Sequence, residues 1–200
     1  MFVQTIEGRT SDPAGVKRQL ERWKAELMRD APGYLGSTAG VTADGTAFVM
    51  ARFESEADAK ANAARPEQSA WWEETAKHFD GDPTFHDSSD VEELMGGGSD
   101  DAGFVQVMIG RVTDRSRLRE VDASMAEVLP RHRPDLIGAI RAWQPDGTAV
   151  EVAYFTSEAE ARAGEGRERP DDVAAAFAEF QSLVPDMRFL DLGEPILVSP

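Results

Sequence analysis

Two glutamines stand out as side chains that could hold a small molecule. Gln4 and Gln106 each interrupt a run of Phe, Val, Ile or Met that is typical of a strand. A buried amide needs hydrogen-bond partners, so each could hold a ligand carbonyl group or dioxygen. Alternatively, the two amides could bond to each other across a symmetry axis. Both residues are therefore candidate ligand contacts, and the mutual bond stays open as the structural alternative.

Two tryptophans and a histidine form a second group of candidates. Trp71 and Trp72 are adjacent in a predicted helix, where neighbouring side chains point about 100° apart. One indole could therefore pack on a sheet while the other borders a pocket, and plain core packing is the alternative. His78, near the end of that helix, is the histidine best placed to act as a base or a haem ligand. Its alternative is a histidine at a helix end, stabilised by the helix dipole.

Other site chemistries have little support in the sequence. The chain has no cysteine and three histidines, which excludes disulfides and thiolate metal sites. His132 lies between two prolines, and we expect it in a loop rather than as a base. We therefore expect no metal and no flavin, with haem on His78 as an alternative, and no residue is assigned as catalytic.

The charge of the chain restricts its partners. It carries 37 acidic and 21 basic residues, a net charge of −16. Such a chain repels phosphate groups, so we expect neither nucleic acid nor an anionic membrane as a partner. Because no apolar run reaches the length of a membrane span and the N-terminus lacks the pattern of a signal peptide, we expect a cytoplasmic protein. A small-molecule ligand remains as the expected partner.

An internal duplication organises these candidates. When the chain is shifted by 102 positions, residues 2–61 align without a gap on residues 104–163, and 21 of the 60 pairs are identical. The spacing matches a domain rather than the short period of a repeat array. We predict a first copy over residues 1–95, a Gly-rich acidic linker over 96–102 and a second copy over 103–200.

Each copy has the pattern of a βαββαβ unit. The first copy shows strand-like runs at 2–9, 34–41, 47–53 and from 84, and helical runs after Asp12, after Ser55 and over 71–79. The second copy repeats this order, and each copy has an Asp-Gly pair that predicts a hairpin turn. The order predicts two ferredoxin-like α+β units, each with helices on one face of an antiparallel sheet. Since the other face is apolar, we expect the copies to pack sheet to sheet as a pseudo-dimer, with a further homodimer left open.

The order of elements resembles the dimeric α+β barrel superfamily. The run 53–57 (Phe-Glu-Ser-Glu-Ala), followed by Trp71-Trp72, is similar to its antibiotic-biosynthesis-monooxygenase branch. That resemblance implies a barrel of paired sheets. It also implies one of several activities, because the branch includes cofactor-independent oxygenases of aromatic substrates and haem-degrading oxygenases.

The resemblance and the residues together give our functional hypothesis. We expect a cofactor-independent oxygenase of an aromatic or apolar substrate, with a non-catalytic binding or assembly module and a haem protein as alternatives. We place the pocket in the first copy, because alanines 175 and 176 stand where that copy has Trp71 and Trp72. Arg52 and Tyr154, unlike residues at matching strand positions, complete the candidate set. The predicted ligand-binding residues are Gln4, Arg52, Trp71, Trp72, His78, Gln106 and Tyr154.

Overall fold

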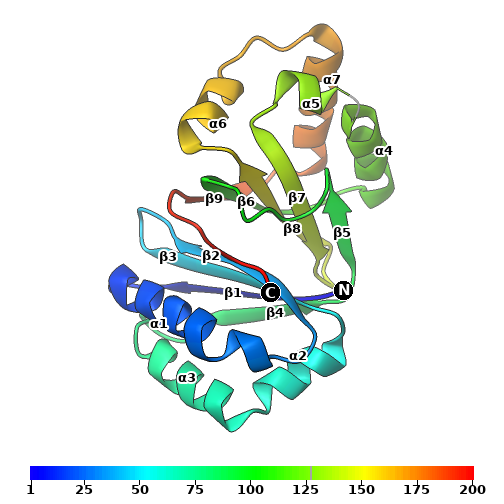
Figure 1. The fold of residues 1–200 in the computed structure, drawn as a ribbon. Coiled ribbons are helices and arrows are strands. Elements are labelled where there is room, and N and C mark those ends of the chain that lie inside the picture. The colour runs from blue at the N-terminus through cyan, green and yellow to red at the C-terminus, as the bar shows by residue number, and fades with distance from the viewer. Residues whose placement is uncertain (127) are drawn as a thin grey trace. The chain divides into compact units, whose positions relative to one another are not determined.

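Alternating apolar residues build two separate antiparallel sheets in the computed structural model, which describes residues 1–126 and 128–200 (Figure 1). Contacts within the chain divide it into two units. The first comprises Met1–Val91 and Leu192–Pro200, and the second comprises Glu92–Asp191. The predicted α+β class with two ferredoxin-like units is confirmed.

The first unit has a five-stranded sheet in the order β10-β2-β3-β1-β4. Its strands are β1 (Phe2–Arg9), β2 (Tyr34–Val41), β3 (Thr46–Phe53), β4 (Thr84–Ser88) and β10 (Ile196–Val198). Its helices are α1 (Pro13–Glu26), the short 3-10 helix η1 (Met28–Asp30), α2 (Glu56–Ala63) and α3 (Pro66–Ala76).

The second unit repeats this arrangement in the order β5-β7-β8-β6-β9. Its strands are β5 (Val91–Leu94), β6 (Phe104–Arg111), β7 (Leu136–Trp143), β8 (Thr148–Phe155) and β9 (Arg188–Leu192). Its helices are α4 (Arg115–Ala126), α5 (Leu129–His132), α6 (Glu158–Glu165) and α7 (Asp171–Leu183). None of the helices in the described part of the chain has the length and apolar character needed to cross a membrane.

Local sequence signals explain where the helices begin. Asp12 caps α1, accepting a hydrogen bond from the Gly15 amide at 2.8 Å, and proline occupies the first turn. Ser55 and Ser157 cap α2 and α6 in the same way. The first helix ends at Glu26, and the short 3-10 helix η1 follows it before β2.

The tails of the two sequence copies do not stay in their own units. Residues 91–94 form β5, which lies beside β7 in the second sheet, and residues 196–198 form β10, which pairs with β2 in the first sheet. The units therefore differ from the predicted copies 1–95 and 103–200 at both ends. Part of the predicted linker belongs to the second unit, since a Cβ on Gly138 would lie 2.0 Å from the Gly97 carbonyl oxygen.

In each unit the helices cover one sheet face. In the first, Tyr34 and Phe53 from the sheet pack with Leu20 and Trp23 of α1. In the second, two apolar clusters cover the corresponding face. One contains Leu118, Trp143 and Leu183, and the other contains Phe104, Ala153 and Phe155. The expected sheet-to-sheet packing of the copies stays a prediction.

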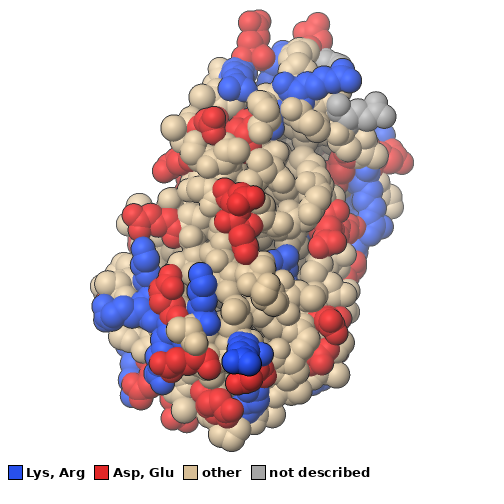
Figure 2. Space-filling view, viewed as in Figure 1, with Lys and Arg blue, Asp and Glu red and all other residues tan. Residues whose placement is uncertain are grey.

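The excess of acidic residues is distributed over the surface. Figure 2 shows acidic and basic side chains interspersed on the viewed face. Many form exposed pairs along helices, such as Arg22–Glu26 at 2.8 Å and Lys60–Glu56 at 2.6 Å. Exposed pairs of this kind contribute little to stability because solvent screens them.

Candidate functional site

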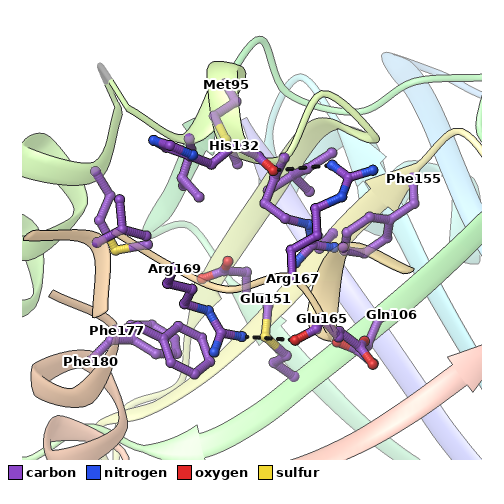
Figure 3. Close-up of a pocket in the computed structure, with 18 of the residues that line it drawn as sticks. Met95, Gln106, His132, Glu151, Phe155, Glu165, Arg167, Arg169, Phe177 and Phe180 are labelled. Atoms are coloured by element: carbon purple, nitrogen blue, oxygen red, sulfur yellow. Dashed lines mark hydrogen bonds between the residues drawn. The ribbon is translucent and has the colours of Figure 1, made fainter. Parts of the chain in front are cut away.

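The second unit contains a cavity of about 550 Å³ between its sheet and its helices (Figure 3). The strands β6 and β8 contribute Gln106, Met108 and Ala153, and the helices α4, α5, α6 and α7 also contribute to the walls. Ala153 is a small residue on the helix-facing side of β8, so it leaves room above the sheet. A cavity of this size is typical of small-molecule sites.

The first unit has aromatic side chains where the second has its cavity. Trp23 of α1 packs on Tyr34 of β2, with ring centroids 4.8 Å apart, and Trp71 of α3 lies 6.5 Å from Trp23. The repeat places Met125 and Leu136 at the positions of Trp23 and Tyr34, and both line the cavity. Replacing two large rings by smaller flexible side chains leaves space that the first unit fills.

The prediction that the pocket lies in the first copy is therefore wrong for this cavity. Ala175 of α7 is exposed rather than packed on the sheet. Instead α7 lines the cavity with side chains at helical spacing, including Val173 and Phe177. The C-terminal part of α7 is fixed through Leu183, which packs with Leu118 of α4, so the helix does not collapse onto the sheet.

A polar group faces the cavity from β6. The Gln106 side-chain nitrogen donates to Asp191 Oδ1 at 2.9 Å, and Asp191 also pairs with Arg162 of α6. The Gln106 carbonyl oxygen has no hydrogen bond within the described part of the chain. It is therefore available to accept a hydrogen bond from a ligand.

A buried group of charges lies beside the apolar walls. Arg141 of β7 is 1% exposed, and its Nη2 lies 2.6 Å from Oε2 of Glu151, directly opposite on β8. Arg141 Nη1 lies 2.6 Å from Asp122 Oδ2 of α4 and 3.4 Å from Glu92 Oε2 of β5. Asp122 and Glu151 both line the cavity. We call Asp122, Arg141 and Glu151 the charged triad.

Burial affects the protonation of Glu151. It raises the pKa of Glu151, and the nearby carboxylates of Asp122 and Glu92 raise it further, while Arg141 opposes them. Glu92 differs because hydrogen bonds from Arg119, Trp143 and Arg115 lower its pKa against the effect of burial. Of these two glutamates, Glu151 is therefore the one that more readily takes up a proton.

The segment after α6 forms the solvent side of the cavity. Arg167 donates to the His132 carbonyl oxygen at 3.4 Å, and Arg169 donates to the Glu165 carbonyl oxygen at 3.4 Å (Figure 3). The Arg169 guanidinium also lies 4.3 Å from the centre of the Phe177 ring. His132, expected in a loop, lies in α5 and lines the cavity.

Gln106 is the predicted site residue that lines this cavity. Gln4 lies in the first unit, where its amide nitrogen donates to Asp87 at 2.9 Å, so the two glutamines bond to separate aspartates. Arg52 and Tyr154 lie on the sheet face opposite to the glutamines, because their strand positions have the other parity.

The remaining predicted residues lie in the first unit with structural contacts. Trp71 donates from its indole nitrogen to the Gln19 carbonyl oxygen at 2.8 Å. Trp72 packs on Phe85, with ring centroids 5.1 Å apart. His78 Nδ1 lies 2.8 Å from Oδ2 of Asp12, the cap of α1. A ligand-binding role for these residues stays a prediction. No cluster of His, Asp and Glu in the described residues could hold a metal ion.

Sequence reasoning missed the charged triad, although the duplication carried the signal. The triad positions correspond to Leu20, Ala39 and Val49 of the first copy. A comparison of the two copies for positions that change from apolar to charged would have selected all three together.

Comparison with known proteins identifies the fold and leaves the activity open. No protein-family profile and no curated protein matches the chain. Among solved structures, a candidate monooxygenase from Fusobacterium nucleatum superposes with a TM-score of 0.75 at 7% identity, covering 99% of this chain and 94% of that protein. A candidate monooxygenase from Lactobacillus acidophilus gives 0.70 at 11% identity, covering 99% of both chains.

A third similar structure has a more specific name. An anthrone oxidase-like protein superposes with a TM-score of 0.70 at 11% identity, covering 99% of this chain and 92% of that protein. At these identities the likeness concerns the fold, and it extends over the whole duplicated chain. The protein therefore shares the fold of these three structures over its whole duplicated length.

Proposed function

We propose that the second unit oxidises an electron-rich aromatic molecule with dioxygen, using no bound metal or flavin. The observation that carries this proposal is the cavity of about 550 Å³, which is lined by Met, Leu and Phe side chains together with charged and polar side chains. Its size suits a molecule of two or three fused rings.

In this reaction the substrate supplies the electrons. A methylene group between two aromatic rings and one dioxygen molecule would give a carbonyl group and water, so one oxygen atom enters each product. The apolar walls would exclude bulk water from the reacting carbon. The Gln106 amide nitrogen, which keeps a second proton beyond its bond to Asp191, would donate to a carbonyl group of the ring system.

The similar structures support this reaction class through their names. Two are candidate monooxygenases and one is anthrone oxidase-like. An anthrone carries the kind of methylene group that this chemistry needs, so anthrone is the first substrate to test.

The experiment measures oxygen uptake and anthraquinone formation when the purified protein is mixed with anthrone. We expect turnover above the spontaneous rate. The matched control copies the first unit's packing into the cavity by the double change Met125→Trp and Leu136→Tyr. This variant should keep its fold and lose turnover, because the two rings occupy the substrate volume.

Other results would favour the alternatives. Saturable binding of anthrone by the wild type without oxygen uptake would overturn the oxygenase and support a binding module. Turnover that survives in the filled variant would place the reaction outside this cavity. A haem spectrum after addition of haemin, lost in His132→Ala, would support a haem protein, with His132 rather than His78 as the residue at the cavity.

A further inference from the structure

The charged triad occupies positions that this fold can fill with apolar residues. In the first unit the equivalent side chains of Leu20, Ala39 and Val49 belong to one apolar cluster. The backbone pairing is the same in both units, since Ala39 lies opposite Val49 as Arg141 lies opposite Glu151. Equivalent positions of the same fold therefore hold apolar side chains in the first unit and charged side chains in the second.

This comparison argues against a purely structural role for the triad. Taking charges out of water is costly, and replacing a buried ion pair by well-packed apolar residues is often neutral or stabilising. The first unit shows that apolar side chains can occupy these positions in the same fold. The comparison therefore favours a role for the charges other than folding, and two of the three residues, Asp122 and Glu151, line the cavity.

The geometry leaves one oxygen of Glu151 open. Both short contacts from Arg141, at 2.8 Å from Nε and at 2.6 Å from Nη2, go to Oε2. Oε1 has no hydrogen bond within the described part of the chain, and the Glu151 side chain is 13% exposed and lines the cavity. A carboxylate fixed by one oxygen presents the other to a ligand in a defined position.

Burial, rather than the neighbouring charges, favours uptake of a proton by Glu151. The carboxylates of Asp122, Glu151 and Glu92 surround Arg141, and Arg115 and Arg119 also pair with Glu92. The neighbours from β6 and α7 in the cavity wall, such as Met108 and Phe177, are uncharged. Protonation of Glu151 would therefore remove a charge that is otherwise held out of water.

We propose that Glu151 is the proton acceptor for the substrate of this cavity, with Arg141 and Asp122 as positioning residues. This proposal rests on the proposed oxygenase function. It narrows the substrate class to aromatic molecules with a weakly acidic C–H or O–H group directed at Oε1. Burial, with a smaller contribution from the charge of Asp122, makes Glu151 a stronger base than an isolated glutamate, against the opposing effect of Arg141.

The step balances as follows. The C–H bond of the methylene group breaks, its proton forms an O–H bond at Oε1, and the electron pair stays on the aromatic system as an enolate. The enolate is oxidised and dioxygen is reduced, with one oxygen atom retained as the carbonyl oxygen. The second oxygen atom leaves as water, which takes up the proton held by Glu151 and the second proton of the methylene group.

The first test is Glu151→Gln, which keeps the shape and removes the basic oxygen. With anthrone, kcat should fall by about 10²- to 10⁴-fold, the range for loss of a general base. In the wild type kcat should rise with pH as Glu151 loses its proton. This rise should disappear in the Glu151→Gln variant. In Asp122→Asn the rise should move to lower pH, because a repelling charge is lost. Glu120→Gln, on the outer side of α4, is the matched control and should keep the wild-type rate.

A second test separates folding from chemistry. The triple change Asp122→Leu, Arg141→Ala and Glu151→Val copies the first unit and should fold. Wild type should bind 1-hydroxynaphthalene more tightly than 1-methoxynaphthalene by about tenfold or more, the value of a hydrogen bond to a charged acceptor. The triple variant should bind both compounds and lose that preference.

The outcomes distinguish the two proposals. If the wild type neither consumes oxygen nor binds the aromatic probes, the oxygenase proposal fails, and the role of Glu151 fails with it. If the wild type turns over and Glu151→Gln keeps both the rate and the pH profile, the proton-acceptor role alone is overturned. A hydroxyl preference that persists in the triple variant would also overturn it, because another group would then contact the hydroxyl.

Discussion

At the scale of single residues, Glu151 makes the stability of the protein depend on pH. Its pKa is raised in the folded state above the usual 4.5, chiefly by burial. The folded state therefore holds more protons than the unfolded state between the usual and the raised pKa. Stability is fully present below the usual pKa and falls as pH rises through the raised pKa.

This pH dependence gives a prediction for Glu151→Gln, which cannot ionise. The free energy of unfolding of the wild type should fall relative to that of the variant as pH increases above about 4.5. Urea unfolding at a series of pH values measures the difference. The free energy of unfolding of the control variant Glu120→Gln should change with pH in parallel with that of the wild type. Parallel curves for Glu151→Gln as well would show that Glu151 is an ordinary carboxylate in the folded state.

At the scale of elements, the two Asp-Gly hairpins differ although their sequences match. Gly45 and Gly147 both have positive φ, +83° and +87°, as the Asp-Gly pairs predict. A Cβ on Gly45 would lie 2.6 Å from the Thr10 carbonyl oxygen, whereas a Cβ on Gly147 meets nothing within 4 Å. Both glycine carbonyls accept a hydrogen bond from the residue after the neighbouring strand, Thr10 and Val112, but only at Gly45 is the place of a Cβ already occupied.

The difference predicts unequal costs for the same substitution. Gly147→Ala should destabilise by about 1–2 kcal/mol, the cost of the left-handed conformation for a residue with a Cβ. Gly45→Ala should cost more, because the Thr10 carbonyl must also move. Thermal unfolding of both variants measures the costs. Equal costs would mean that the hairpin next to Thr10 relaxes freely.

At the scale of the whole molecule, the exchanged strands determine which unit each tail stabilises. Ile196 and Val198 of β10 are buried in the cluster that contains Tyr34 and Phe53 of the first unit. Sequence position assigns these residues to the second copy, whereas their contacts lie in the first unit. Each copy therefore contributes one edge strand to the other copy's sheet.

Ile196→Ala tests this exchange. Loss of a buried isoleucine side chain should destabilise the first unit by about 2–5 kcal/mol. Hydrogen exchange should increase in β2, the partner of β10, and stay unchanged in β7. Leu197→Ala, in the same strand but only half-buried, should have the smaller effect. Increased exchange in β7 alone would contradict the assignment of β10.

The sequence by itself determined the duplication, the order of elements and most of the turns. These features depend on short-range patterns, such as the cap at Asp12 and the glycine at position 45, which act through neighbouring residues. The boundaries of the two copies also followed from the repeat, except at the tails. Pairing of β5 and β10 depends on which sheet edge is free in space, and no local pattern encodes that.

The tertiary structure alone decided where the cavity lies. From the sequence, Trp71 and Trp72 are predicted to border a pocket. In the structure Trp71 packs near Trp23, which packs on Tyr34, and these rings together fill the space between helices and sheet. The candidate site depends in the same way on residues far apart in the chain. Asp122, Arg141 and Glu151 come from a helix and two strands, and only packing brings their charges within hydrogen-bond distance and removes them from water.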